Sequence, residues 1–310
     1  MNIENKTTFY IAVFYYTQTG QLLEIIKSVL SPLLAGGCKI TYKEIVPEKP
    51  FVFPWTKESF YEVFPESRAE ISVKIKEIDF SDISDASLVI LGYQPWYLAP
   101  SIPFASFMDN TDTKQYLKGR NVVTVVGSRN MWISAHLSIK SRLSKLGCNW
   151  CGNIALEDRH NNYVSVLTIF RWLIDGKKSA TRFLPQAGVS QKDIDNASIH
   201  GEFILASLKE NDLSQLQKKI VEKGGAEFHP HMYFIESNGN KLWGKWAEFV
   251  LEKGQFGDKK RAFRLKLFEY YLLTVIFAAS PFGLAFFSLT YPFRRRTYAK
   301  IRKNILFLQN

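Results

Sequence analysis

The sequence predicts an α/β fold built on a doubly wound, five-stranded parallel sheet in the order 2-1-3-4-5. Short apolar runs alternate with segments of helical periodicity, which is the pattern of a parallel sheet covered on both faces. The runs alternate poorly between polar and apolar residues, as strands buried on both faces do. A short hydroxyl-rich turn joins the first run to the first helix. With 310 residues, the chain can hold one large domain and an appendage.

The expected elements follow the chain in alternation. We predict five strands, at Phe9–Phe14, Lys39–Ile45, Ala86–Gly92, Asn121–Gly127 and Asn153–Leu156. We predict helices from Leu22 to Leu30 and over Pro103–Tyr116, Trp132–Leu146 and Lys192–Leu208. In the order 2-1-3-4-5, a ligand binds outside the carboxyl ends of strands one, three and four. The turns after these three strands are therefore the candidate site.

The turn after the first strand has the composition of a phosphate cradle. Its residues are Thr17, Gln18, Thr19, Gly20, Gln21 and Leu22. Free N–H groups of the first helical turn attract anions, the threonines add hydroxyl donors, and a glycine permits close approach. The turn contains no lysine or arginine, which argues against a nucleoside triphosphate loop. A single phosphate, as in flavin mononucleotide (FMN), fits better, and the alternative is a plain helix cap at Thr17 or Thr19.

This turn resembles the phosphate loop of the flavodoxin family, Thr/Ser-x-Thr-Gly-x-Thr, at Thr17, Thr19 and Gly20. It departs from the family at Leu22, where a third hydroxyl is usual. The resemblance implies a flavodoxin-like fold and FMN as the cofactor, with one side-chain contact to the phosphate missing.

The turns after strands three and four supply aromatic and polar groups for a flavin ring. The first contains Tyr93, Gln94, Pro95, Trp96 and Tyr97, and the second contains Gly127, Ser128, Arg129 and Asn130. We expect Trp96 and Tyr97 to stack on the ring with Tyr93 behind them, and amides near Gln94 and at 128–130 to bind its edge. Ordinary packing above the sheet is the alternative for each aromatic residue.

Two residues are candidates for chemistry at this site. Arg129 is placed to stabilise negative charge on the reduced flavin or on a substrate oxyanion. His160 follows the fifth strand and is a candidate proton donor, although a surface loop histidine is the commoner case.

The chain divides into three parts. Residues 1–210 form the predicted FMN-binding domain, 211–257 a helical or irregular connector, and 258–310 a tail. Within the domain, the insertion 46–80 is rich in proline and aromatic residues and too apolar for a disordered linker. It is either an ordered cover over a site or docking surface, or a satellite core beneath a long loop.

Charge and cysteine content exclude several classes of protein. The net charge is +11, but residues 258–304 carry 11 basic and two acidic residues, so the body is nearly neutral and not a nucleic-acid-binding surface. Cys148 and Cys151 form a Cys-x-x-Cys without a second pair, so we expect no zinc or other metal site. A redox motif is the alternative, but the pair follows a predicted helix instead of starting one, so we interpret both as reduced core cysteines. No signal peptide is evident at 1–8, which favours a cytoplasmic body.

The tail has the composition of a membrane-associated segment. Residues 265–293 are strongly apolar and just long enough to span a bilayer. Pro281 and Gly283 divide the run, and both flanks are basic, which favours a helical hairpin in one leaflet or an interfacial element over a single span. We expect attachment to the cytoplasmic side of the inner membrane, and a buried C-terminal helix is the less favoured alternative.

Several motifs together resemble a bacterial family of dialkylresorcinol condensing enzymes. They are Tyr16–Leu22, Phe53-Pro54-Trp55, Val63–Ser67, Leu91–Trp96, Ser128–Trp132 and Ala187–Ser190. The resemblance covers most of the chain and implies a flavodoxin-like protein of dialkylresorcinol or flexirubin-type pigment synthesis. No cysteine and histidine set of the ketosynthase type is evident, so a redox step is favoured, such as oxidation of a cyclic diketone to a resorcinol ring.

Three functions therefore remain open. The first is a membrane-associated, FMN-dependent oxidoreductase or aromatase acting on long-alkyl lipids. The second is a flavodoxin-like electron carrier for a membrane protein partner. The third is a flavin-free scaffold that keeps the fold and the condensing-enzyme role. An enzyme needs a substrate pocket against the flavin, whereas a carrier needs an exposed flavin edge.

Overall fold

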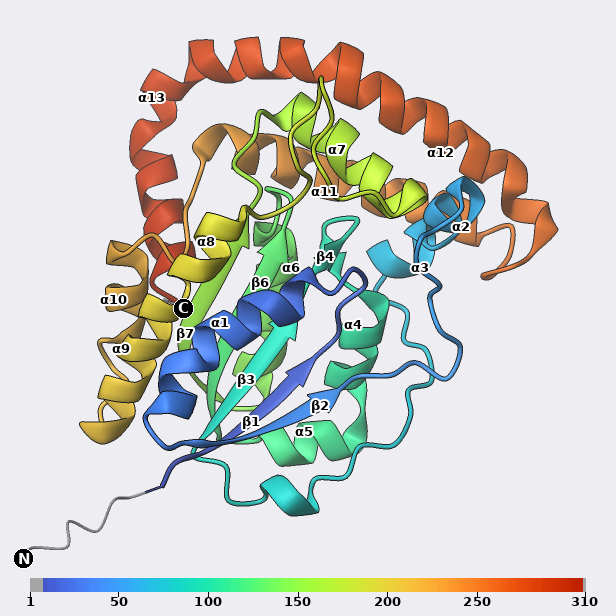
Figure 1. Cartoon of the computed structure of the whole chain (residues 1–310). Helices are drawn as coiled ribbons and strands as arrows, with labels where there is room; N and C mark the ends of the chain where they lie inside the picture. The colour runs from blue at the N-terminus through green and yellow to red at the C-terminus, as the bar shows by residue number, and fades with distance from the viewer. Residues whose placement is uncertain (1–7, 309–310) are drawn as a thin grey trace, which may run out of the picture.

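A five-stranded parallel sheet lies at the centre of the computed structural model, which describes residues 8–308 (Figure 1). Its strands are β1 (Tyr10–Tyr15), β2 (Lys39–Glu44), β3 (Leu88–Tyr93), β6 (Asn121–Ser128) and β7 (Asn149–Glu157). They pair in the order β2-β1-β3-β6-β7, so the predicted order 2-1-3-4-5 is confirmed. A small hairpin of β4 (Pro95–Trp96) and β5 (Ala99–Pro100) follows β3.

Helices cover both faces of the sheet. One face packs against α1 (Gln21–Ala35), α8 (Gln191–Asn196), α9 (Ser198–Lys209) and α10 (Leu216–Glu222). The other packs against α4 (Ile102–Asp109), α5 (Thr111–Leu117) and α6 (Ile133–Lys145). All six residues of β3 are buried, as its uninterrupted apolar run predicts.

Three predicted boundaries need correction. The expected helix 103–116 is two helices, because the Asn110 side chain accepts a hydrogen bond from Thr113 N (3.1 Å) and caps α5. The expected helix 192–208 likewise divides at Ala197 into α8 and α9. The last strand begins at Asn149 rather than Asn153, because a register shift leaves Cys151 unpaired and breaks the alternation of its sequence.

The insertion 46–80 is ordered. It contains α2 (Lys57–Glu62) and α3 (Phe64–Arg68), which lie near the carboxyl ends of the strands. Trp55 and Val63 form a small buried cluster with Ile102 of α4. Two further helices, α7 (Asn162–Asp175) and α11 (Pro230–Leu251), lie beside it at the same end of the molecule (Figure 1).

The tail is one continuous helical stretch from Lys259 to Leu306. It comprises a 3-10 turn (Lys259–Arg261), α12 (Ala262–Thr274), a π-helical segment (Val275–Ala279) and α13 (Ser280–Leu306), and it arches over the carboxyl ends of the strands (Figure 1). The predicted division at Pro281 and Gly283 is wrong. Proline lacks an N–H and clashes with the carbonyl four residues earlier, and the wider π turn before Pro281 is a local adjustment that lets the helix continue.

Both ends of this helix are fixed to the same globular body. At its start, Arg261 is fully buried and pairs with Glu62 and Glu66, and the Phe268 ring stacks on Phe64 at 3.5 Å. At its end, the Gln217 side chain donates to the Leu306 carbonyl (2.6 Å). The helix therefore lies along the protein surface instead of projecting from it.

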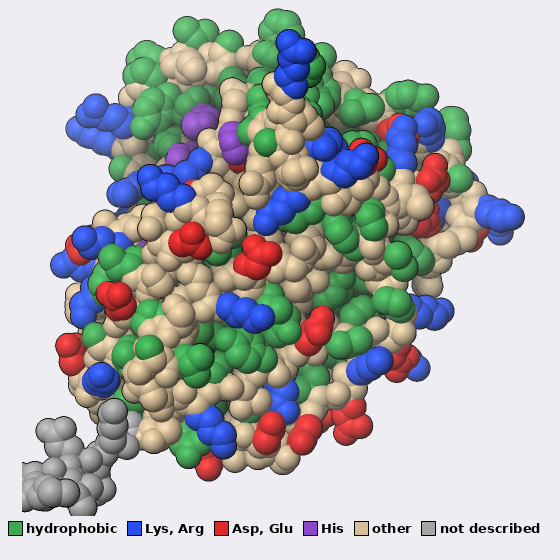
Figure 2. Space-filling model, viewed as in Figure 1, with side chains coloured by type: hydrophobic (Ala, Val, Ile, Leu, Met, Phe, Trp, Pro, Cys, Tyr) green, Lys and Arg blue, Asp and Glu red, His purple; other side chains and the backbone are tan. Residues whose placement is uncertain are grey.

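The outer face of the tail is apolar. Large side chains are exposed along it, with fractions of 72% for Phe263, 78% for Phe282, 74% for Leu289 and 89% for Phe293. Figure 2 shows hydrophobic side chains gathered along the upper edge of the molecule, where the arch runs, with basic side chains among them. By length and composition alone, this helix is able to cross a membrane. Only a small part of its most apolar stretch is buried against the body.

Candidate functional site

The turn between β1 and α1 has the geometry of an anion cradle. Gly20 has a positive φ of 85°, which a side chain would strain, and its N–H donates to Thr17 Oγ1 (3.1 Å). Its carbonyl accepts from Leu23 and Glu24 at the start of α1. Within residues 8–308, the N–H groups of Gln21 and Leu22 have no protein acceptor. These free donors at the start of a 15-residue helix can bind an anion.

Two polar side chains of the cradle support neighbouring loops. Gln18 donates to the Phe51 carbonyl (2.8 Å) and so connects the turn to the insertion 46–80. Gln21 exchanges two hydrogen bonds with the backbone of Val189, at 2.9 and 3.0 Å. Gly188 lies so close that a Cβ there would be 2.5 Å from Gln21 Oε1. These glutamines therefore hold the cradle in place through contacts with other loops.

A cavity of about 340 Å³ opens beside the cradle. The turns after β1, β3 and β6 line one end of it, as the sheet order predicts. The rest of the lining comes from the insertion, α7, α11 and the tail helix, and most of these residues are apolar. Pockets of this size that are mainly apolar with a few polar groups are typical of small-molecule sites.

The turn after β3 brings aromatic side chains to the cavity wall. Trp96 packs edge-on against Tyr16 and Trp55, with ring centroids at 5.7 and 5.0 Å. Tyr97 has a positive φ of 47° in the hairpin turn, and its hydroxyl donates to the Phe60 carbonyl (2.5 Å). The Gln94 amide, oriented to satisfy its neighbours, accepts from Trp96 Nε1 (2.9 Å) and Gln18 N (3.2 Å).

The turn after β6 supplies a hydroxyl and a guanidinium. Ser128 Oγ is buried and has no partner within residues 8–308, although the residue lines the cavity. Arg129 donates to Asn162 Oδ1 (2.6 Å) at the start of α7, and no carboxylate of the described residues lies within ion-pair distance of it. Burial lowers the pKa of Arg129 to about 10, so it remains cationic at neutral pH. An anion in the cavity would therefore be attracted to it.

The predicted site residues separate into two groups. Those lining the cavity are Thr19, Gln21, Leu22, Gln94, Pro95, Trp96, Tyr97, Gly127, Ser128 and Arg129. Those outside the lining are Thr17, Gln18, Gly20, Tyr93, Asn130 and His160. Of the second group, Tyr93 points into the core, where its ring packs 5.2 Å from Phe104, and Asn130 donates to Asn162 Oδ1 (3.0 Å). Leu22 is 2% exposed and contributes no hydroxyl to the cradle.

His160 lies on the loop between β7 and α7. Its Nδ1 is 2.6 Å from Asp158 Oδ1, and the second oxygen of that carboxylate accepts from Ser165 Oγ (2.9 Å). These contacts fix the loop, and a proton-donor role for His160 stays a prediction.

Two walls of the cavity, α7 and the tail helix, are not predicted from the sequence motifs. Phe170, Trp172, Leu272 and Ile276 all line it from these helices. The signal available was the helical periodicity of apolar residues over 162–175, which indicates a helix but not its neighbour.

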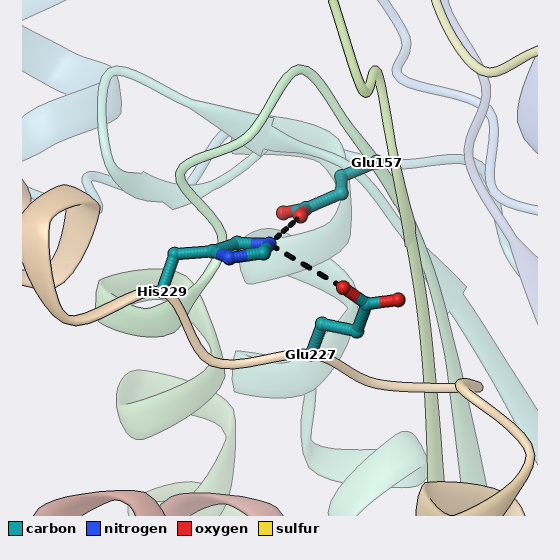
Figure 3. Close-up of side chains that lie close together, drawn as sticks. All are labelled: Glu157, Glu227 and His229. Carbon is teal, nitrogen blue, oxygen red and sulfur yellow. Dashed lines mark hydrogen bonds and ion pairs between the residues drawn. The ribbon is translucent and has the colours of Figure 1, made fainter.

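A second polar cluster lies near the end of β7, outside the cavity lining (Figure 3). His229 Nε2 is 2.5 Å from Glu157 Oε1 and 3.6 Å from Glu227 Oε2. Glu227 also pairs with Arg159 (2.9 Å). The hydrogen bond to Glu157 raises the pKa of His229, which favours a charged imidazolium. This cluster fastens the segment before α11 to the sheet as a network of ion pairs.

The cysteines have the properties of core residues. All three are free thiols, and Cys151 donates to the Val122 carbonyl (3.2 Å). Burial raises the pKa of Cys148 to about 11 and that of Cys151 to about 12. Thiolates are the nucleophilic and redox-active form, so these residues are poor candidates for redox chemistry at neutral pH.

No protein-family model matches this chain, and no curated protein matches it. Solved structures match part of it. A candidate flavoprotein from Bacteroides eggerthii is 19% identical over 54% of this chain and 99% of that one (TM-score 0.38). A flavodoxin from the domain Archaea is 11% identical over 65% of this chain and 99% of that one, with a TM-score of 0.39. A flavoprotein in complex with FMN from Lactobacillus acidophilus is 17% identical over 47% of this chain and 92% of that one, with a TM-score of 0.35.

These similarities are too low to carry an argument about function. The flavodoxin-like arrangement of this chain rests on its own sheet order, the helices on both faces and the position of the cavity.

Proposed function

We propose that the protein is a membrane-associated, FMN-dependent oxidoreductase or aromatase that acts on long-alkyl lipids of the dialkylresorcinol type. The observation that carries the proposal is the cavity, which is lined both by residues of the anion cradle and by an apolar wall. A cofactor with one phosphate and a flat ring suits the cradle, and a lipid-like substrate suits the apolar wall.

The donors of the site fit FMN. The free N–H groups of Gln21 and Leu22 and the hydroxyl of Thr19 would hold the phosphate, in place of the third hydroxyl that Leu22 lacks. Ser128 Oγ, buried and without a partner in the described chain, would bind a polar edge of the ring. Trp96 and Tyr97 offer aromatic surface beside it.

When bound, FMN would supply a two-electron acceptor for hydride. Oxidation of a cyclic diketone to a resorcinol ring removes a hydride and a proton, and negative charge develops on the ring oxygens. Arg129 lines the cavity without a carboxylate partner in the described chain, so it would bind and stabilise such an oxygen. The aromatic insertion and α7 would exclude water from the reacting ring.

The walls of the cavity favour an enzyme over an electron carrier. A carrier needs a flavin edge open to its protein partner, whereas Trp55 and Phe60 of the insertion and Phe170 of α7 add apolar walls that a small-molecule substrate can contact. The third possibility, a flavin-free scaffold, would provide no hydrogen-bond partner for the buried hydroxyl of Ser128.

We further propose that the tail lies on the membrane surface, on the cytoplasmic side, and does not span the bilayer. Its two ends dock on one body, so the exposed apolar face between them would enter one leaflet. Arg294, Arg295 and Arg296 are exposed at the end of the apolar stretch, where they would contact anionic headgroups.

A titration of the full-length protein with FMN in mild detergent tests the cofactor. Bound FMN should shift the flavin absorbance spectrum and quench its fluorescence. Thr19→Val should weaken binding by roughly 10-fold or more, since a hydrogen bond to a charged group contributes about 1.5–3 kcal/mol, and Ser128→Ala by about 5-fold.

Ser31→Ala is the matched control, because Ser31 is exposed on α1 and bonds only within the helix, to the Ser28 carbonyl. It should leave the affinity for FMN unchanged. Failure of the wild-type protein to bind added FMN would rule out both the enzyme and the carrier.

A further inference from the structure

The tail helix contributes to the wall of the cavity as well as to the outer surface. Leu272 and Ile276 line the cavity, and Leu272 is only 7% exposed. On the same helix, Leu273 and Phe277 line the cavity but are 42% and 45% exposed. A residue that is exposed and also lines a cavity lies at its opening.

The opposite side of this opening is α7. Leu167 lines the cavity and is 48% exposed. One turn before it, the Tyr163 hydroxyl lies 3.0 Å from Ser280 Oγ, and the Tyr163 ring stacks on Phe277 with centroids 6.4 Å apart. The cavity therefore has a mouth, formed by Leu167, Leu273 and Phe277, with the Tyr163–Ser280 contact at its side.

The π-helical segment Val275–Ala279 lies at this mouth, and none of its five residues is buried. Such segments interrupt the regular hydrogen bonding of a helix and occur frequently at functional sites. The exposed apolar face of the tail continues from the mouth through Phe282 and Phe286.

We propose that an alkyl chain enters the cavity through this mouth directly from the membrane, so that the tail is a wall of the lipid-binding site and not only an anchor. The proposal rests on the membrane-surface function above and specifies where its substrate binds. Every cavity-lining residue of α7 and the tail is apolar, whereas Arg129, the group proposed above to bind a substrate oxygen, comes from the turn after β6. An amphipathic lipid with its head inward matches this distribution.

Photo-crosslinking tests the route. Full-length protein, with saturating FMN, is bound to vesicles of phosphatidylglycerol and phosphatidylethanolamine that contain a palmitate analogue with a diazirine on its chain. Adducts on Trp55 and Leu272 are diagnostic, because both line the cavity and are only 6% and 7% exposed. Adducts on Phe286 and Phe293 report surface contact alone.

We expect adducts on Trp55 and Leu272 in the wild type, and at least a 5-fold loss on Trp55 in Leu273→Trp, which narrows the mouth. Leu289→Trp is the matched control, since Leu289 is 74% exposed on the same helix and does not line the cavity. It should leave both adducts unchanged. Vesicle binding measured in parallel shows that both variants fold and attach.

Adducts confined to the outer face, or equal labelling of Trp55 in the two variants, would overturn the proposal. The proposed cofactor fails independently: if the wild type binds no FMN in a parallel titration while Trp55 is labelled, the chain-binding route stands and the flavin does not. If FMN binds and Trp55 is not labelled, the proposed cofactor stands and the chain-binding route does not.

Discussion

The body and the tail of this protein place their apolar residues in opposite ways. In the body, the central strands are closed on both faces, and all six residues of β3 are buried. In the tail, Phe282 and Phe293 are 78% and 89% exposed on a helix whose two ends are nonetheless docked. Burial of apolar area drives the folding of the body, whereas the apolar face of the tail remains available for an outside partner.

The difference teaches that one helix can pack as a structural strap on its inner side and still leave large apolar side chains exposed on its outer side. Phe268 is fully buried against Phe64, while Phe286 is 57% exposed. A test of this difference therefore requires substitutions that affect only the inner side or only the outer side of the tail helix.

The largest expected effect comes from the buried ion pair at the start of the tail. Arg261 is fully buried and pairs with Glu66 Oε1 at 2.5 Å, so Glu66→Ala leaves a buried guanidinium whose one remaining carboxylate partner among residues 8–308 is Glu62. We expect a loss of about 3–5 kcal/mol in the free energy of unfolding, measured by urea denaturation.

Glu252→Ala is the control for this prediction. Glu252, at the end of α11, pairs with Arg264 of the tail helix, but the Glu252 side chain is 67% exposed. The expected loss in the free energy of unfolding is therefore at most about 1 kcal/mol. Equal losses of unfolding free energy in the two variants would mean that the buried ion pair of Arg261 stabilises the tail no more than an exposed ion pair does.

The sequence predicted the body better than the tail, for a physical reason. A strand such as β3 is recognised from its own residues, because a fully buried strand needs an uninterrupted apolar run, and the anion cradle follows from Thr17, Thr19 and Gly20 alone. The tail was expected to break at Pro281, since proline disrupts a regular helix, but the π-helical segment before it absorbs the disruption. That adjustment depends on backbone geometry that no residue pattern specifies.

The same limit applies to the site. The three turns at the carboxyl ends of β1, β3 and β6 follow from strand order, so Gln94, Ser128 and Arg129 could be placed beside Thr19 from the sequence. The roles of Phe170 and Leu273 could not, because their position depends on how α7 and the tail pack over those turns. Tyr93 was misplaced for a related reason, since alternation along β3 decides whether a side chain faces the core or the cavity.

A second prediction concerns the outer side of the tail. Replacement of Arg294, Arg295 and Arg296 by alanine should lower the affinity for phosphatidylglycerol vesicles by roughly 100-fold at low salt, because each basic residue contributes about 1 kcal/mol near an anionic surface. Co-sedimentation with vesicles measures this change. Alanine at Lys49, Lys74 and Lys76, which are exposed on the body, should have little effect, and a similar loss there would refute a specific role for the tail.

The smallest expected effect comes from an anchor that titrates. His229 fastens the segment before α11 to Glu157, and the tail packs on α11. The hydrogen bond with Glu157 raises the pKa of His229 above 6.5 in the folded protein. A group of this kind stabilises the fold fully below its unfolded pKa, and the contribution is lost as the pH rises through the folded value. The free energy of unfolding should therefore fall modestly as the pH rises above 6.5, and His229→Gln should remove that part of the dependence.

His231→Gln is the control, because burial lowers the pKa of His231 and its contribution has the opposite sign. If His229→Gln keeps the wild-type dependence between pH 6 and roughly 8 in urea unfolding, the imidazolium does not contribute to the attachment of α11.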